Sequence, residues 1–382
     1  MTKGFLAAVS MMLALAFQPA AKAVNPPLRS ASPDDEVRGA WLATVVGLDW
    51  PDSTFVPIAQ QLKLVEQIRE LAELGCNTVF FQVVSNMDAL YPSDILPWSS
   101  VLTGTEGVNP GYDPLELAVK AAHECGMKIH AWINPLRVSR QLSDVHCATH
   151  VSKTHPAWVQ RYGRTLYLDP GIPDAVKFLK SIAEEIMGRY DVDGLHIDDY
   201  FYPDGLQKAQ RSWKLDSWRR YGKGARLDAW RYSTVNAVVK MLSEVSHTLK
   251  PGSRFGVSPS GRLANTLRLY ADPRMWVAEG SVDYLAPQIY WAIDRPDNAA
   301  FGTVLDSWKD IARGVPVYVG IAAYKHDDAY NKGLDVPFAS FGEFYRQLEL
   351  CRNAPWVKGH IWFRTKYILD NDFKSYILSE LY

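Results

Sequence analysis

Strand-like and helix-like segments alternate along almost the whole chain from residue 37 onward. Between the short apolar runs lie stretches whose apolar residues recur every three or four positions, the spacing of an amphipathic helix. The first of these stretches ends at Gly75 and places Ile58, Leu62, Val65, Ile68, Ala72 and Leu74 on one stripe. The strand-like runs are 37–46, 77–84, 128–134, 194–198, 254–260, 284–290, 316–323 and 359–364.

Strands that alternate with helices favour a parallel sheet, because each parallel connection needs a long crossover. Eight such units over roughly 340 residues predict an α/β fold, a (β/α)8 TIM barrel with extended loops at the carboxyl-terminal face of the strands. A doubly wound open sheet is the alternative, but no glycine-rich turn follows the first strand. We therefore expect a single domain over residues 37–382.

Residues 1–23 have the pattern of a secretory signal peptide rather than of folded structure. Lys3 gives a positive start, residues 4–17 are apolar, and Ala21-Lys22-Ala23 is a small-x-small cleavage site. The apolar stretch is too short for a stable membrane anchor. We expect residues 24–36 to be a linker and the mature protein to begin at Val24. The protein would then be exported to the periplasm or cell envelope without a membrane span.

The composition limits the classes of partner that the protein is expected to bind. The net charge of -1 favours neither nucleic acid nor an anionic membrane surface. His146, His150 and His155 share one loop and could form a site, but solvated side chains are the expected state. Because the histidines form no complete metal motif such as H-E-x-x-H, we expect neither a metal nor a cofactor. The oligomeric state stays open.

The four cysteines fit no zinc pattern. Cys76 and Cys125 each end a predicted helix just before a strand, so they could lie close at one end of the barrel. Export permits a disulfide between them. Buried free thiols are an equal alternative.

Two adjacent carboxylates, Asp198 and Asp199, follow a short apolar strand and precede Tyr200, Phe201 and Tyr202. Unpaired charges are costly to bury in a strand, whereas the carboxyl end of a barrel strand is where active sites gather. Carboxylates beside flat aromatic faces favour carbohydrate chemistry. Strict alternation would point Asp199 outward, so we expect the strand to end at about Asp198 and both carboxylates to reach the barrel mouth.

Polar side chains also alternate toward the carboxyl ends of neighbouring strands, which sends each set to one face. An outer surface covered by helices would not tolerate them, whereas the mouth of a barrel would. The residues are His130, Trp132 and Asn134 on one strand, His196 and Asp198 on the next, then Ser258 and Ser260, and then Gln288 and Tyr290.

Several stretches together resemble one known family, the glycosyl-hydrolase-like 10 family of bacterial envelope proteins. They include EVRGAWL at 36–42, HAWINPLRV at 130–138, DDYFY at 198–202, GVSPSG at 256–261 and APQIYW at 286–291. The resemblance covers nearly all of residues 36–382 and implies a barrel glycosidase that acts on peptidoglycan strands lacking stem peptides. Thr365 stands where relatives often have an acid, which puts more weight on the Asp198-Asp199 pair.

Adjacent carboxylates suit substrate-assisted hydrolysis, in which the 2-acetamido carbonyl of the sugar attacks the anomeric carbon. Peptidoglycan is built of 2-acetamido sugars, so the resemblance and the pair agree. By analogy, Asp198 would orient the amide and Asp199 would be the general acid and base, although their order stays open. Alternatively, one of them only forms a salt bridge with Arg137 or Arg364.

The remaining site residues would bind sugar. We expect Asn134, Gln288 and Tyr290 to hydrogen-bond the amide or ring hydroxyls of the sugar. Alternatively, they are polar residues of the barrel wall whose hydrogen bonds are satisfied within the protein. Arg137 would contact the lactyl carboxylate of muramic acid, or else pair with Asp199. The other expected binding residues are Trp132, Tyr200, Trp291 and Arg364.

Four other acidic residues are weaker candidates for catalysis. Asp49 and Asp88 lie in loops after the first two strands and are second-line candidates, whereas Asp191 and Asp193 precede a strand and should be structural.

Two other functions remain as alternatives. One is a non-catalytic glycan-binding envelope protein, because barrels can keep a groove and lose the chemistry. The other is a glycosidase of another amino-sugar polymer.

Overall fold

The structure is a computed structural model that describes residues 36–51, 54–209 and 212–381. The predicted signal peptide and all of the predicted linker except Glu36 lie outside the described residues. Within the described part of the chain, no helix combines the length and hydrophobicity that a bilayer-spanning segment needs.

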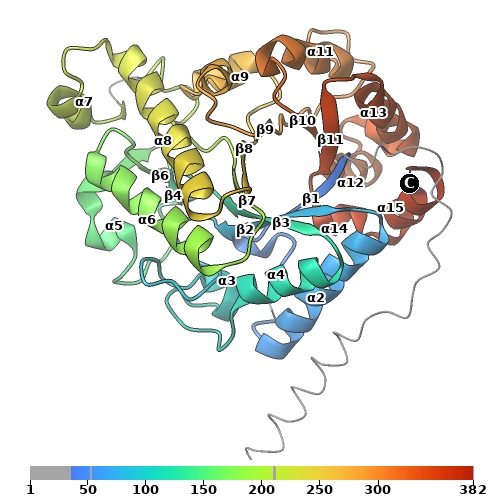
Figure 1. Cartoon of the computed structure of the whole chain (residues 1–382), viewed down its shortest axis with the longest axis horizontal. Helices are drawn as coiled ribbons and strands as arrows, with labels where there is room; N and C mark the ends of the chain where they lie inside the picture. Colours follow the sequence, from blue (N-terminus) through green and yellow to red (C-terminus); the bar gives the residue numbers. More distant parts are fainter. Residues whose placement is uncertain (1–35, 52–53, 210–211, 382) are drawn as a thin grey trace, which may run out of the picture.

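Eight parallel strands close into a barrel in the order β1-β11-β10-β9-β8-β7-β3-β2, and helices surround it (Figure 1). Each strand-like run of the sequence supplies one barrel strand, so the prediction of a (β/α)8 barrel is confirmed. The barrel strands are β1 (Val37–Leu42), β2 (Thr78–Val84), β3 (Lys128–Ile133), β7 (Gly194–Ile197), β8 (Arg254–Val257), β9 (Tyr284–Leu285), β10 (Val317–Ile321) and β11 (Val357–Trp362).

β8 and β9 end earlier than the sequence pattern predicted. Pro259 and Pro287 follow these strands closely, and proline has no N–H to donate to a neighbouring strand. Isolated bridges at Ser260 and Gln288 still hold the two segments side by side beyond the prolines. The polar residues of both segments therefore stay at the barrel mouth.

Helices connect the barrel strands. The α-helices are α2 (Pro57–Glu73), α3 (Ser100–Thr103), α4 (Pro114–Glu124), α5 (Val151–Thr154), α6 (Pro173–Arg189), α7 (Asp216–Tyr221), α8 (Leu227–Leu249), α9 (Leu263–Arg268), α10 (Pro273–Ala278), α11 (Phe301–Ala312), α12 (Tyr324–Lys332), α13 (Phe341–Asn353), α14 (Thr365–Ile368) and α15 (Asn371–Tyr376). Shorter or irregular helical turns are η1 (Val45–Gly47), η2 (Pro156–Trp158), η4 (Val336–Ala339) and η5 (Ile377–Leu381).

The buried face of α2 differs from the predicted stripe. Leu64, Val65, Ile68 and Leu71 are buried, whereas Leu62 is 37% exposed. Residues 64, 68 and 71 share one face of a helix, and position 62 lies about 200° away from position 64. The helix itself ends at Glu73, just before Gly75, as predicted.

A small antiparallel sheet, which the sequence did not reveal, follows β3. It consists of β4 (Arg137–Ser139), β5 (Val159–Tyr162) and β6 (Thr165–Leu168) in the order β4-β6-β5, and lies to one side of the barrel strands (Figure 1). Leu136 joins this sheet to the barrel mouth, because its N–H donates to the carbonyl of Tyr200. The sheet is therefore part of the extended loop region around the candidate site.

Aromatic side chains fill the inside of the barrel. Gly256 on β8 makes room for one of them, since a Cβ there would lie 2.1 Å from Cζ of Tyr284. A second, larger core packs between the strands and the helices. The buried cluster inside the barrel consists of Trp41, Ala43, Phe80, Trp132, Tyr284, Ala286, Tyr318 and Ile361.

Candidate active site

A pocket of about 130 Å³ lies at the carboxyl ends of the barrel strands. Most of the sequence-predicted site residues meet in its wall, while Trp291 and Arg364 are outside the lining. The lining residues are Trp41, Ala43, Val45, Leu48, Gln82, Trp132, Asn134, Arg137, Asp198, Asp199, Tyr200, Ser258, Gln288, Tyr290 and Phe363.

Asp198 and Asp199 both line the pocket because the chain leaves the barrel just before them. β7 ends at Ile197, whose carbonyl still accepts from the N–H of Ser258 on the neighbouring segment. Beyond it, the N–H of Phe201 donates to the carbonyl of Asp199 and closes a turn. The expected change of direction at the strand end is confirmed, and it brings both adjacent carboxylates to the mouth.

Asp198 is the deeper of the two acids and only 4% exposed. Trp132 Nε1 donates to its Oδ2 at 3.1 Å, and the N–H of Tyr200 donates to Oδ1 at 3.4 Å. Burial raises the pKa of Asp198 to about 8, against the lowering effect of the Arg137 charge. The charge of Asp199 raises it further, as expected when two carboxylates share a site.

Asp199 also lines the pocket and is more exposed than Asp198, being only partly buried. Burial raises its pKa to about 6, while hydrogen bonds, including one from the Gln288 side chain, oppose the rise. Because the two carboxylates interact, their titrations belong to the pair rather than to either residue alone. At neutral pH, this site is therefore expected to hold one proton.

A chain of amides connects β1 and β2 to Asp198. Gln82 Oε1 accepts from the N–H groups of Thr44 and Val45, both at 2.9 Å, so its Nε2 must point to Asn134 Oδ1, at 2.8 Å. Asn134 Oδ1 also lies 3.0 Å from Asp198 Oδ2, which satisfies both oxygens only when Asp198 carries a proton. With Oδ1 toward Gln82, Asn134 Nδ2 faces Arg137 Nη2, so two donors meet. In the opposite orientation the Asn134 nitrogen donates to Asp198 Oδ2 and the Asn134 oxygen accepts from Arg137 Nη2. Asn134 thus lies between Gln82, Arg137 and Asp198.

The charged neighbours do not neutralise the pair. Arg137 Nε donates to the carbonyl of Ser85 at 3.1 Å, and its guanidinium stacks over Tyr200, 4.0 Å from the ring centroid. Among the described residues, neither Asp198 nor Asp199 takes part in a salt bridge. The alternative that one of them only forms a salt bridge with Arg137 or Arg364 is not realised.

Arg364 has a structural partner instead. It follows β11 and forms an ion pair with Asp49, its Nη1 lying 2.7 Å from Oδ1. Asp49 also accepts from the N–H of Ala43 at 2.7 Å, so this second-line acid is fully engaged. Burial raises the pKa of Asp49, against the lowering effect of Arg364.

The remaining acids of the sequence analysis are also held in structural contacts. Asp88 accepts from the N–H of Asn86 at 2.9 Å. Asp193 pairs with Lys128 at 2.8 Å, and Asp191 pairs with Lys250. Trp291 lies against Gly261, where a Cβ would come within 2.8 Å of Trp291 Cζ3.

Sequence reasoning placed Ser258 at the barrel mouth but missed six other residues of the pocket wall: Trp41, Ala43, Val45, Leu48, Gln82 and Phe363. Trp41 and Gln82 had a usable signal, because they alternate with Gly39 and Phe80 and so share the inward face of their strands. Phe363 had no such signal, because it lies beyond the end of β11.

A hydrogen-bonded chain of buried side chains lies beneath the pocket. Trp41 Nε1 donates to His196 Nε2 at 3.1 Å, so His196 Nδ1 carries the hydrogen that reaches Tyr284 Oη at 3.0 Å. Tyr284 in turn donates to His130 Nδ1 at 2.8 Å. Burial lowers the pKa of His196 strongly and that of His130 to about 4. Both imidazoles are therefore neutral supports of the pocket floor.

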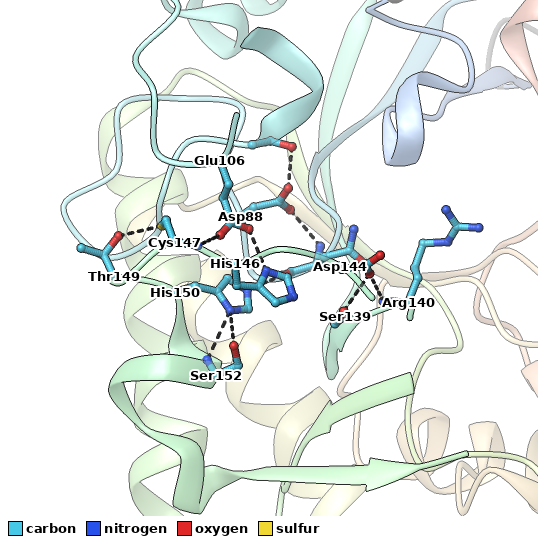
Figure 2. A network of polar contacts seen from close by, with 12 residues as sticks. Asp88, Glu106, Ser139, Arg140, Asp144, His146, Cys147, Thr149, His150 and Ser152 are labelled. Atoms are coloured by element: carbon cyan, nitrogen blue, oxygen red, sulfur yellow. Dashed lines mark hydrogen bonds and ion pairs between the residues drawn. The ribbon is translucent and has the colours of Figure 1, made fainter. Parts of the chain in front are cut away.

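Glu106, His146 and His150 form a cluster away from the pocket (Figure 2). The expectation of solvated loop residues is wrong for the two histidines, since His150 is fully buried and the His146 side chain is 9% exposed. Their rings stack at 3.8 Å with planes 7° apart, so a single ion cannot lie in both ring planes. His146 Nδ1 instead pairs with Glu106 Oε1 at 3.0 Å, while His150 Nε2 faces the carbonyl of Asn86 at 2.9 Å. These contacts hold the loop that carries His146 and His150 in place.

All four cysteines are free thiols, so the alternative of a Cys76–Cys125 disulfide is not realised. Burial raises the pKa of Cys76 to about 12, which makes this thiol unreactive.

Comparisons with known proteins agree with this architecture. The chain is 35% identical to the glycosyl hydrolase YngK of Bacillus subtilis strain 168, over 94% of this chain and 74% of that protein. It is 36% identical to the glycosyl hydrolase DigH of Escherichia coli strain K12, over 90% of this chain and 86% of that protein.

Solved structures share the fold at low sequence identity. One is the glycoside hydrolase domain of PgaB (BpsB) from Bordetella bronchiseptica, with a TM-score of 0.57 and 13% identity, over 90% of this chain and 98% of that one. Another is the catalytic domain of β-amylase from Paenibacillus polymyxa, with a TM-score of 0.57 and 14% identity, over 91% and 98%. The family model of the glycosyl hydrolase-like 10 proteins matches residues 36–338. The chain therefore belongs to the glycosyl hydrolase-like 10 family, as its motifs indicated.

Proposed function

We propose that this protein is an O-glycosyl hydrolase that cleaves the glycan strands of peptidoglycan, in particular strands without stem peptides. The observation that carries the proposal is the Asp198-Asp199 pair, which lines an aromatic-walled pocket without ionic partners among the described residues. Raised carboxyl pKa values suit a group that must hold a proton near neutral pH. The names of the relatives, both glycosyl hydrolases, support the reaction class.

Asp199 is the proposed general acid, because it is the more exposed of the two carboxyls that line the pocket. In the first step, the 2-acetamido carbonyl oxygen forms a bond to the anomeric carbon as the glycosidic C–O bond breaks. Asp199 donates its proton to the leaving oxygen, and a cyclic oxazolinium ion remains. In the second step, Asp199 takes a proton from water, whose oxygen attacks the anomeric carbon and opens the ring with retained configuration.

Asp198 is the proposed partner of the amide N–H. Its carboxylate accepts a hydrogen bond from that N–H and stabilises the positive charge of the oxazolinium ion. In the free site, its raised pKa keeps Asp198 protonated at neutral pH. A donor placed against it favours the charged form. Substrate binding would therefore move the shared proton from Asp198 to Asp199, which is the arrangement that the first step needs.

Digestion of defined glycans tests this function. Denuded peptidoglycan strands, peptide-bearing strands and chitin oligosaccharides are incubated with the wild type and with Asp199→Asn, and the products are identified by mass. Short muropeptide-free fragments from denuded strands, formed only by the wild type, are the expected result. Cleavage of chitin oligosaccharides alone would assign the enzyme to another amino-sugar polymer. Cleavage of none of them would contradict the proposal and favour a glycan-binding protein.

A further inference from the structure

A second cavity, of about 230 Å³, adjoins the candidate active site and shares Arg137 and Tyr200 with it. Its wall is strongly basic, since it contains three arginines and no acidic side chain. The antiparallel sheet β4-β6-β5 and its loops supply most of this wall. The lining residues are Arg137, Arg140, Gln141, Arg164, Thr165, Tyr167 and Tyr200.

The three arginines lack carboxylate partners, because none of them takes part in a salt bridge with a described residue. Exposed Arg164 can be satisfied by water alone. Arg137 is only 5% exposed, and its charge acts on Asp198 and Asp199 without a salt bridge to either. When the Asp198-Asp199 pair holds one proton, it carries one negative charge against three guanidinium groups, so the junction of the two cavities has an excess of positive charge that an anionic ligand would balance.

Asp144 is the acid of the same loop, but it is bound elsewhere. Its Oδ2 accepts from Ser139 Oγ at 2.8 Å and from the N–H groups of Arg140 and Gln141 at 3.1 and 2.9 Å. Figure 2 shows that the Arg140 guanidinium points away from this network. Asp144 therefore shapes the turn without neutralising the arginines of the cavity.

We propose that the Arg137-Arg140-Arg164 cavity is a carboxylate subsite that takes the free lactyl group of a muramic acid residue beside the cleaved bond. This inference rests on the proposed function. Arginine suits the role, because its planar guanidinium donates two parallel hydrogen bonds to a carboxylate. In peptide-bearing strands, the same lactyl carboxyl is an amide with no charge. The cavity would therefore select strands whose peptides have been removed.

Three substrates and three proteins test this inference. The substrates are denuded strands, the same strands with their carboxyls converted to primary amides, and peptide-bearing strands. The proteins are the wild type, the double variant Arg140→Gln/Arg164→Gln, and the control Arg161→Gln. Arg161 lies on β5 of the same sheet, is exposed, and donates to the carbonyl of Gly163 without lining the cavity.

The wild type and Arg161→Gln should cleave denuded strands at least about tenfold more efficiently than amidated ones, chiefly through KM. The double variant should lose this preference and match the wild type on amidated strands, which also shows that it is folded. Retention of the preference by the double variant, or equal cleavage of both substrates by the wild type, would overturn the subsite while leaving the proposed function standing. Preference for peptide-bearing strands would assign the carboxylate to the peptide and also overturn it. Cleavage of no strand would contradict the proposed function itself.

Discussion

Trp132 Nε1 donates a hydrogen bond to Asp198 Oδ2 across 3.1 Å, which ties the end of β3 to the end of β7. This bond stabilises the charged form of Asp198 and so limits the rise in its pKa that burial causes. The neighbouring acid, Asp199, is more exposed than Asp198 and has a lower pKa. Two adjacent carboxyl groups thus have different environments, which is how one site can contain both an acid and a carboxylate.

The pH dependence of kcat/KM should be bell-shaped. The pKa values of the pair are raised to about 6 and about 8. Below the lower value both acids are protonated, and Asp198 cannot accept the amide N–H. Above the upper value both are ionised, and Asp199 has no proton for the leaving oxygen. Trp132→Phe should move the alkaline limb to higher pH, because it removes a donor that lowers the pKa of Asp198. An activity that is flat across this range would contradict the assignment.

Asp199→Asn should lower kcat by about 10²–10⁴-fold, the usual contribution of a positioned general acid. The melting temperature should stay the same or rise, because a carboxyl whose charged form is disfavoured in the fold is replaced by a neutral amide. Asp193→Asn is a matched control, since Asp193 pairs with Lys128 before β7 rather than beyond its carboxyl end. The control should keep wild-type kinetics. If Asp199→Asn stays within a few-fold of the wild type, Asp199 is not the acid.

Asp198→Asn should become more stable relative to the wild type as the pH rises. The folded pKa of Asp198, about 8, exceeds its ordinary value of 3.8, so the folded state binds more protons between these values. The free energy of unfolding of the wild type therefore falls as the pH increases toward about 8. Asparagine does not ionise and avoids this loss. Denaturant unfolding of both proteins at about pH 5 and about pH 9 would measure the difference between their free energies of unfolding. If the advantage of Asp198→Asn shrinks as the pH rises, the pKa of Asp198 is not raised.

Arg364→Gln should destabilise the protein by about 3–5 kcal/mol, because it leaves the buried carboxylate of Asp49 without its partner. The double variant Asp49→Asn/Arg364→Gln should recover part of the loss, since no buried charge remains. A double-mutant cycle of unfolding free energies would measure the coupling. Normal stability together with a raised KM would instead support the sugar-binding role that the sequence predicted for Arg364.

The fold and the central pair could be predicted from the sequence because their signals are local. Alternation places Trp132 and Asn134 on the same face of one strand, and the barrel brings that face to the mouth. The position of Asp198 and Asp199 at the barrel mouth could likewise be predicted from the end of one apolar strand. Prolines ended β8 and β9 early without moving Gln288 away from the pocket.

The remaining features depend on partners far away in the sequence. Arg364 was expected to bind sugar, but its contact is with Asp49, 315 positions earlier. The roles of Gln82 and of the buried pair His146 and Glu106 depend in the same way on loops that fold back over the barrel. The basic cavity at β4 and β6 exists only because an antiparallel sheet brings Arg164 near Arg137. No local pattern of the sequence contains such contacts.

In the proposed mechanism, the 2-acetamido group of the substrate is the nucleophile and Asp198 holds its nitrogen. The inhibition constant of a thiazoline mimic of the cyclic intermediate, measured for the wild type and for Asp198→Asn, tests it most directly. The mimic should inhibit the wild type strongly, because it resembles the state that the site stabilises. Asp198→Asn should weaken this inhibition by at least about tenfold, as expected for the loss of a charged hydrogen-bond partner. Equal inhibition of the two proteins, or none of the wild type, would contradict the account.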